Sequence, residues 1–240
     1  MREFFSLEGN FNKYGGFVAD TLILSLLWIL FSIPVITIGA STAALFYVAT
    51  RRIANREGYI TSDFWQAFKA NFAKATVLWI FIFVIIILLI WNMWLALENP
   101  ELMGAFGGIV LPAQIVILVE VLFITTFIFP VTARFDMGIK ETIKTCFFMA
   151  NRHLLTSFTC VASIGILLWL SFLVWPPLLF VTPGIYAMFA SFMIMRIFKK
   201  YRPEMDKDPV LELQELELQR AEEKRLAEIG KIAKIEEEQN

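Results

Sequence analysis

The stretch that decides the fold reads ATVLWIFIFVIIILLIWNMWLAL and spans residues 75–97. It contains no Asp, Glu, Lys or Arg, and it is longer than the roughly 20 residues that an α-helix needs to cross a bilayer. Over the whole chain, 58% of the 240 residues are hydrophobic and 24 are Phe. This composition is not that of a soluble domain of the same size. The sequence therefore predicts an all-α, polytopic membrane helix bundle.

Three further apolar runs are long enough to cross a bilayer. They cover residues 21–50, 102–133 and 153–195, and Glu120 is their one acidic or basic residue. The last run is about twice one crossing and contains Pro176 and Pro177 near its middle. Because proline removes a helical hydrogen-bond donor, this run predicts two helices, at 157–175 and 178–198.

The first apolar run is harder to divide, because it exceeds one crossing and is interrupted by Pro34 and Gly39. We expect one helix at 17–33, an irregular segment from Pro34 to Gly39, and then a second helical piece. The total is five transmembrane helices. Six crossings are the alternative, in which Pro34–Gly39 is a turn between two short helices.

The basic residues of the body lie in two connections between these runs. They are Arg51, Arg52, Arg56, Lys69 and Lys74 in the first connection, and Arg134, Lys140, Lys144 and Arg152 in the second. Short basic connections stay on the cytoplasmic side during insertion. Five crossings therefore place the amino terminus outside and the carboxyl terminus in the cytoplasm, whereas six would place the amino terminus inside.

The charges also divide the chain near residue 203. Residues 204–240 hold 6 Lys+Arg and 12 Asp+Glu, which leaves 15 and 10 for residues 1–203. The sequence predicts a membrane domain at 1–203 and a charged, helical, cytoplasmic tail at 204–240. Since the basic residues of the body sit between long uncharged runs, we expect no nucleic-acid partner; the bilayer itself is the expected partner.

Parts of the membrane domain resemble each other at a constant offset. Phe68, Ala70, Asn71 and Thr76 recur 80 positions later as Phe148, Ala150, Asn151 and Thr156. This pattern predicts an internal repeat at 17–97 and 104–175, with the last helix at 178–198 following it. Chance similarity between apolar segments is the alternative.

The basic connections also have an amphipathic pattern. In residues 62–74, Phe64, Phe68 and Phe72 recur at helical spacing while Lys69 lies off their row. The pattern is typical of a helix lying under the bilayer, and a docking surface for a partner is the alternative. The docking candidates are Arg51, Arg52, Phe64, Phe68, Lys69, Asn71, Arg134, Asn151 and Arg152.

Glu120 and Gln114 are the polar candidates inside the membrane. A charged side chain at the bilayer centre costs about 2.5–3.5 kcal/mol on insertion scales. We therefore expect Glu120 to face other helices and to be protonated or hydrogen-bonded rather than exposed to lipid. Two roles remain open, an interhelical hydrogen bond and a proton or substrate site.

Conventional catalytic signals are weak. Two cysteines and one histidine exclude a disulfide framework and a Cys/His metal cluster. The sequence has no Walker loop, no Gly-x-Gly-x-x-Gly, no Gly-x-Ser-x-Gly and no His-Glu-x-x-His. We therefore predict no catalytic residue, no metal and no cofactor.

Several segments carry a family resemblance. The block Leu26–Leu45, and above all its part from Pro34 to Leu45, is followed by Asp63-Phe64 and by Phe68–Phe72. Together with Arg134-Phe135 and Asn151–Leu154, these segments resemble the YesL-like family of bacterial integral membrane proteins over roughly residues 1–200.

The resemblance implies a small protein of the bacterial cell membrane, encoded among genes for oligosaccharide uptake and breakdown, with a role beside an ABC-type sugar importer. The importer's permease and ATPase subunits would be its partners. Neither basic connection has the Glu-Ala-Ala and following Gly of such permeases. The resemblance thus favours a non-enzymatic accessory or assembly subunit, and a small stand-alone transporter or channel with Glu120 as its site is the alternative.

Overall fold

The computed structural model describes residues 10–54, 58–99, 107–173, 175–201, 219–220 and 225. Within these residues the fold is all-α, with seven α-helices and two short 3-10 helices. Their bounds are α1 (Asn10–Ser32), η2 (Val35–Thr37), α2 (Ile38–Ile53), α3 (Ile60–Glu98), α5 (Gly107–Arg134), α6 (Ile139–Arg152), α7 (Leu154–Leu173), η4 (Pro176–Phe180) and α8 (Thr182–Tyr201). The predicted tail helix at 204–240 lies outside the described residues, except at 219–220 and 225.

Several of these helices have the length and composition of membrane spans. Four qualify over Gly15–Ser32, Ile60–Glu98, Ile109–Arg134 and Leu154–Leu173, and α8 adds a shorter apolar helix at Thr182–Phe198. The predicted multi-pass helical fold is confirmed at this level. The number of crossings, five or six, stays a prediction.

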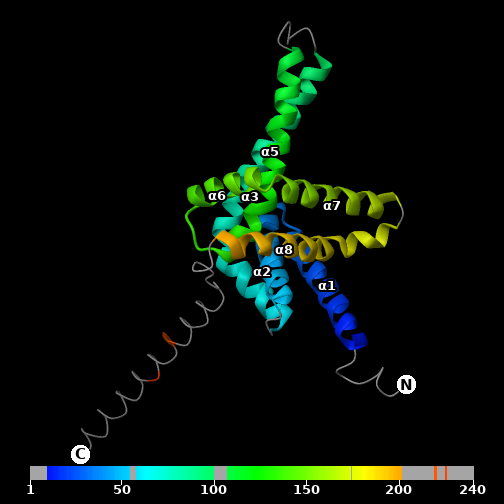
Figure 1. The fold of residues 1–240 in the computed structure, drawn as a ribbon, viewed down its shortest axis with the longest axis vertical. Coiled ribbons are helices and arrows are strands. Elements are labelled where there is room, and N and C mark those ends of the chain that lie inside the picture. Colours follow the sequence, from blue (N-terminus) through cyan, green and yellow to red (C-terminus); the bar gives the residue numbers. More distant parts are fainter. Residues whose placement is uncertain are drawn as a thin grey trace, which may run out of the picture.

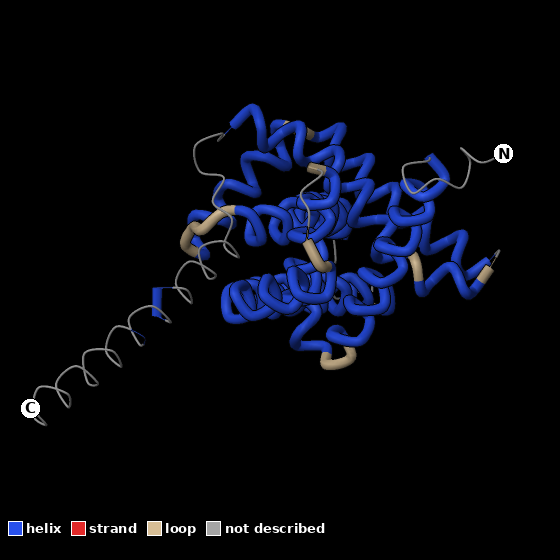
Figure 2. The backbone as a smooth tube through the Cα atoms, turned by 90° about the horizontal axis from the view of Figure 1, so that it is seen from below, coloured by secondary structure: helices blue, strands red, loops and turns tan. Residues whose placement is uncertain are grey.

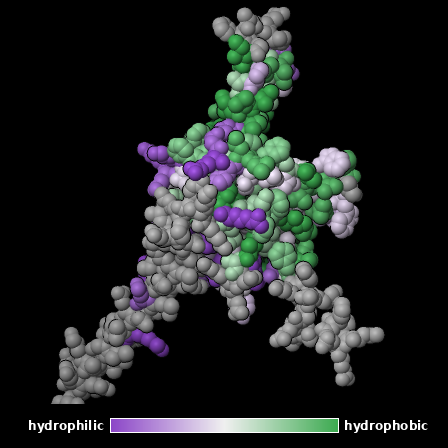
Figure 3. All heavy atoms as spheres, viewed as in Figure 1, coloured by the Kyte–Doolittle hydropathy of each residue, from purple (hydrophilic) through white to green (hydrophobic). Residues whose placement is uncertain are grey.

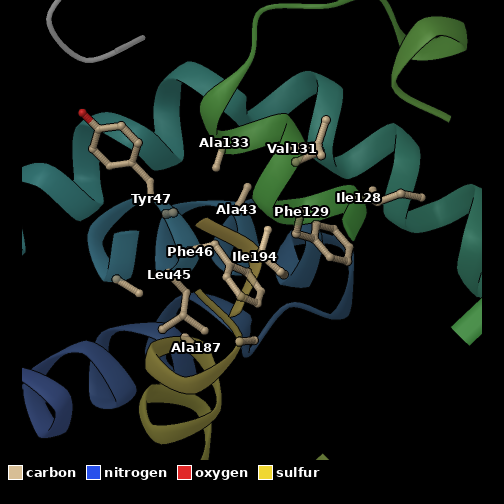
Figure 4. Packing of buried hydrophobic residues seen from close by; sticks show 14 of the residues in the cluster. Ala43, Leu45, Phe46, Tyr47, Ile128, Phe129, Val131, Ala133, Ala187 and Ile194 are labelled. Carbon is tan, nitrogen blue, oxygen red and sulfur yellow. The ribbon is translucent and has the colours of Figure 1, made fainter. Parts of the chain in front are cut away.

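Helix α2 lies at the centre of the bundle. All of its residues from Gly39 to Thr50 are buried except Thr42, which is half-buried. Figure 4 shows Phe46 of α2 beside Ile194 of α8, with Phe129 of α5 in the same cluster. The helix is rich in Ala, Gly and Ser, and such small residues let neighbouring backbones approach closely.

Helices α1 and α2 form an antiparallel pair around the break at Pro34. The backbone is extended at Pro34, and the Thr37 hydroxyl donates to the Phe31 and Pro34 carbonyls at 2.6 and 2.7 Å. Further along the pair, the Trp28 indole donates to the Thr42 hydroxyl at 3.1 Å. Residues 33–37 are therefore a turn that reverses the chain, as in the six-crossing alternative.

Helix α3 packs antiparallel to α2 along the whole of α2. Arg51 pairs with Asp63 at one end, and Gly39 lies so close to α3 at the other that a Cβ there would meet the Ala75 carbonyl and the Trp79 Cβ. The prediction of a separate cytoplasmic helix at 62–74 is therefore wrong. Those residues are the first part of one continuous 39-residue helix.

Beyond α2, α3 pairs with α5. Trp79 contacts Phe129 at a ring separation of 6.4 Å, and Asn92 contacts Gln114, so the two helices run antiparallel. Their outer halves project away from the other helices in Figure 1. Helices α7 and α8 form another antiparallel pair, joined by η4, which runs across the same view. The view from below in Figure 2 shows the same clustering of helices around the centre.

Helices α6 and α7 follow each other across the view of Figure 1 and meet at His153. The backbone leaves helical geometry there, with φ −118° and ψ 47°. The Ser157 hydroxyl donates to the Ala150 carbonyl at 3.1 Å, which satisfies a backbone group at the interruption. The predicted internal repeat would make this jointed pair the counterpart of the continuous α3, and it stays a prediction.

Helix α8 meets α1 through a glycine. A Cβ on Gly184 would collide with the Ser25 hydroxyl and the Thr21 carbonyl, and the Gly184 N–H already donates to the Ser25 Oγ at 2.9 Å. Gly184→Ala should therefore lower the free energy of unfolding by about 1–3 kcal/mol through overpacking. Thermal unfolding in detergent measures the effect.

Gly165→Ala is the matched control. Gly165 lies in α7 with nothing within 4 Å of the added Cβ, and alanine is the better helix former. Equal melting temperatures for the two variants would show that the α1–α8 contact is looser than described.

Candidate docking site on α6

Helix α6 has the composition of an interfacial helix. It starts after Gly138, whose backbone is extended, and the Thr142 hydroxyl and N–H both donate to the Gly138 carbonyl. One face of the helix is buried against the bundle: Thr142, Cys146, Met149 and Ala150. Two aromatic side chains point outward, Phe147 and Phe148, which are 45% and 60% exposed. Exposed aromatic residues on an otherwise well-packed helix are characteristic of a surface that binds a membrane or a partner.

A hollow of about 580 Å³ lies beside the exposed face of α6. Phe135 and Phe198 form part of its wall and contact each other edge to face at 5.0 Å between ring centres. Phe148 supplies apolar surface from α6, while Asn151 and Arg152 supply polar groups. The hollow can therefore receive an apolar side chain that has an acceptor or a negative charge next to it.

The hollow is connected to Glu120 through Asn151. The Asn151 amide donates to the Glu120 Oε1 at 2.6 Å and to the Phe147 carbonyl at 3.1 Å. The side chain of Glu120 thus has an interhelical hydrogen bond, which is one of the two roles that the sequence left open. Since Asn151 lies in the last turn of α6, Glu120 is level with the α6–α7 junction.

Gln114 has a different partner. Its side-chain amide donates to the Asn92 side chain, so this pair links the projecting halves of α3 and α5. Glu120 and Gln114 therefore do not meet in one site. Each joins α5 to a different neighbour, which is the structural role of polar side chains between membrane helices.

The basic residues at the end of α2 are engaged in ion pairs. Arg51 Nε lies 3.6 Å from Asp63, its guanidinium also donates to the Tyr47 hydroxyl at 3.0 Å, and Arg52 lies 3.3 Å from Asp20. The cations stand in the last turn of α2 and Asp63 in the first turn of α3, so both helix dipoles favour the arrangement. Arg51 and Arg52 thus stabilise the junction of three helices instead of facing a partner.

Three further docking candidates on α3 need a correction. Phe64 and Phe68 are buried, at 0% and 8% exposure, and Asn71 is buried with its amide donating to the Ala67 carbonyl at 3.0 Å. They pack inside the bundle because α3 is continuous and lies along α2. Lys69 is exposed and lies over the Trp65 ring at 4.8 Å.

The remaining candidates belong to the second connection. Asn151 and Arg152 line the hollow and are exposed, and Arg134, at the end of α5, is half-buried. Cys146 lies on the buried face of α6, and burial raises the pKa of its thiol, so the thiol stays protonated at neutral pH. Of the nine predicted docking residues, the structure thus brings Asn151 and Arg152 together at one accessible site.

The sequence did not predict that Phe198 would join Phe135 in the wall of the hollow. It also did not predict Asp20 and Asp63 as partners of the two arginines. Phe198 meets Phe135 across 63 positions, and no local pattern connects them. Asp20 and Asp63 offered a weak signal, because Asp20 directly precedes an apolar run and Asp63 lies within the first basic connection. Opposite charges at the ends of adjacent membrane helices are candidates for pairing.

The surface around α6 is more hydrophilic than the surface of the other helices. In Figure 3, hydrophobic residues cover the projecting α3–α5 pair and the α7–α8 end, while hydrophilic residues gather around α6. The fold and this surface define a multi-pass helical membrane protein with an amphipathic helix at the edge of its apolar surface.

Part of the chain is similar in sequence to known proteins. Residues 21–93 match the family described as "Protein of unknown function, DUF624". The chain is also similar to "Uncharacterized protein YesL" of Bacillus subtilis (strain 168), with 28% identity over 169 residues, which cover 68% of this chain and 77% of that protein. The resemblance to the YesL-like family is thereby confirmed. No solved structure matches the chain significantly.

The Glu120–Asn151 hydrogen bond can be tested with a double-mutant cycle. Glu120→Leu and Asn151→Ala should each lower stability, and the double variant should lose less than the sum, with a coupling of about 0.6–1.7 kcal/mol. Glu120→Gln should keep the stability, because its amide oxygen still accepts from Asn151. Thermal unfolding in detergent provides all four measurements, and additive losses would mean that the two side chains do not interact.

Proposed function

We propose that this protein is a non-enzymatic accessory or assembly subunit that docks to an ABC-type oligosaccharide importer through α6. The observation that carries the proposal is the hollow beside α6, where the exposed Phe148 stands next to Asn151 and Arg152. The choice of an importer as partner comes from the resemblance to the YesL-like family. The class of partner is therefore an inference from relatives, and the docking surface is an inference from geometry.

The chemistry of the hollow suits a protein partner. Aromatic and Arg side chains supply most of the binding energy at typical interfaces, and they act best when surrounding contacts exclude water. Phe148 offers an apolar anchor, and the Arg152 guanidinium offers a planar group for a carboxylate. A permease or ATPase subunit that presents an apolar side chain beside Asp or Glu would complement this surface.

A stand-alone transporter or channel with Glu120 as its site is the second candidate. Its support is the carboxyl group of Glu120 inside a candidate span. Against it, the Glu120 carboxylate is hydrogen-bonded to Asn151, and Gln114 bonds to Asn92 elsewhere on α5. The polar groups are thus tied to separate neighbours and do not line one path, which favours the accessory role.

The contacts between helices also bear on orientation in the bacterial cell membrane. Asp20 of α1 pairs with Arg52 of α2, so the first half of α1 lies beside the basic end of α2. If the basic connections are cytoplasmic, the start of α1 is cytoplasmic too. We therefore favour the six-crossing alternative, with both ends of the membrane domain inside, over the predicted outside position of the amino terminus.

Docking through α6 predicts that Phe148→Ala lowers co-purification of the importer's permease or ATPase subunit with this chain. The expected reduction is about tenfold or more, since removal of an interface aromatic anchor costs about 2 kcal/mol. Quantitative mass spectrometry of the detergent-solubilised complex measures it. Phe158→Ala is the matched control, because Phe158 is exposed to a similar extent, 62%, but lies on α7.

The parent chain must capture a stoichiometric importer subunit for this proposal to stand. If the importer co-purifies equally with Phe148→Ala and Phe158→Ala, the docking surface does not lie on α6. If the purified chain transports a sugar in vesicles without any importer, the accessory role is wrong and the transporter alternative is correct.

Orientation is tested with reporter fusions at residue 1 and residue 240. Activity of a cytoplasmic reporter at both positions is the expected result, because the Asp20–Arg52 pair places both ends of the α1–α2 hairpin on one side. A periplasmic signal at residue 1 with a cytoplasmic signal at residue 240 would restore the five-crossing topology.

A further inference from the structure

A second hollow lies on another side of the molecule and is larger, with a volume of about 730 Å³. Residues of α1, α2, α5, α7, η4 and α8 line it, so it occupies the space where the α7–α8 pair meets the central helices. None of the residues that line the α6 hollow takes part. This site is therefore independent of the proposed docking to an importer.

The wall of the hollow is mostly apolar, and most of the hydroxyl groups in it already donate to a carbonyl of their own helix. Thr125 donates to the Val121 carbonyl at 2.7 Å, Thr182 to the Leu178 carbonyl at 2.9 Å, and Thr42 to the Ile38 carbonyl at 2.6 Å. These hydroxyls use their protons on their own helices, so they have none to donate to a ligand. No Asp, Glu, Lys, Arg or His is among the described residues that line the hollow.

One hydroxyl in the wall differs from the others. The Ser32 Oγ is buried and has no hydrogen-bond partner. Ser32 is the last residue of α1 and precedes Ile33, which also lines the hollow and is 72% exposed. The unpaired hydroxyl is therefore a buried donor without an acceptor in the wall of the hollow, which costs free energy.

The hollow opens onto the apolar outer surface of the protein. Ile33, Phe172 and Phe180 line it and are at the same time 72%, 74% and 55% exposed. Phe172 belongs to a candidate membrane span, so this rim is continuous with the surface that faces lipid. A molecule dissolved in the bilayer reaches the hollow laterally, without passing through water.

The volume and the apolar wall of the hollow decide which class of molecule can bind there. A sugar is disfavoured because a mostly apolar wall without a charged side chain leaves most of its hydroxyl groups without partners. A helix is excluded by size, since a cylinder about 10 Å across with this volume would be only about 9 Å long, less than two helical turns. A flexible hydrocarbon chain suits both the volume and the wall, as apolar ligand sites of about 300–1,000 Å³ do.

We propose that this hollow binds one acyl chain of a glycerophospholipid from the bilayer, with an ester carbonyl of the lipid accepting a hydrogen bond from Ser32. The ester lies where the acyl chain joins the head group, so it is the lipid oxygen that comes to the rim when the chain lies inside. Each methylene group that enters gains packing contacts that a disordered bilayer provides less fully.

The experiment is native mass spectrometry of the full chain purified in a mild detergent and titrated with phosphatidylglycerol. The parent should retain one lipid per chain. Ile164→Trp should reduce retention, because Ile164 lines the hollow and a larger side chain there takes up space that the acyl chain would fill. Ile166→Trp is the matched control, since Ile166 lies on the same helix but is 58% exposed and outside the hollow.

Ser32→Ala tests the polar contact. It should weaken lipid retention several-fold, as expected for one lost hydrogen bond of about 1 kcal/mol, and should not affect retention of a hydrocarbon detergent that lacks an ester. Equal retention by the parent, Ile164→Trp and Ile166→Trp would overturn the proposal. So would a parent that retains no lipid, or one that retains an isoprenoid lipid in preference to phosphatidylglycerol.

If Ile164→Trp fails to fold, a second measurement tests whether an acyl chain occupies the hollow. Trp28 lines the hollow, so phosphatidylglycerol with a brominated acyl chain should quench its fluorescence at one lipid per chain. The contribution of Trp28 is the difference between the parent and Trp28→Phe. An unquenched Trp28 would rule out an acyl chain in the hollow, whereas loss of importer docking in the α6 variants would leave this result unchanged.

Discussion

The burial of α2 on all sides is the constraint on which the rest of the fold depends. A 16-residue helix with neighbours all around it can be accommodated only if its side chains are small or fit between those of its neighbours. Ala, Gly and Ser at the start of α2 let α3 approach to backbone contact, as Gly39 shows. The larger Phe46 and Tyr47 fill space further along. The positions of α1, α3, α5 and α8 follow from what each of them packs against on this helix.

Ion pairs fix the register of α2 against α1 and α3. The ion pairs of Arg51 and Arg52 sit at one end of α2, and the tight turn held by Thr37 sits at the other. Between these ends the contacts are mainly apolar, and the Trp28–Thr42 hydrogen bond adds one polar contact. Buried or half-buried polar contacts are costly to break in a membrane, so a few of them suffice to select one register. The basic residues Arg51 and Arg52 of the first connection are thus part of the architecture, whereas Asn151 and Arg152 of the second connection lie on the exposed face of α6.

The sequence predicted most helices but not their partners. Uncharged runs located α1, the outer part of α3, α5, α7 and α8, because hydrocarbon thickness sets the length of an apolar helix. The error at 62–74 had a physical cause: the sequence changes there from amphipathic to apolar, but no Pro or Gly occurs between Ile60 and Glu98, so nothing ends the helix. The role of α2 was not foreseen, because a helix buried on all faces has no periodic pattern. The partner of Glu120 lies 31 positions away, at Asn151, and pairings across such a distance leave no local signal.

The interruption at His153 gives the two long arms of the molecule different mechanics. Helix α3 is unbroken over 39 residues, so a push on its first turn travels as rigid motion to its far end. Helices α6 and α7 are interrupted at His153, where the backbone leaves helical geometry, so the direction of α6 is set separately from that of α7. A partner seated on α6 would thus contact a helix whose direction differs from that of the candidate membrane span α7.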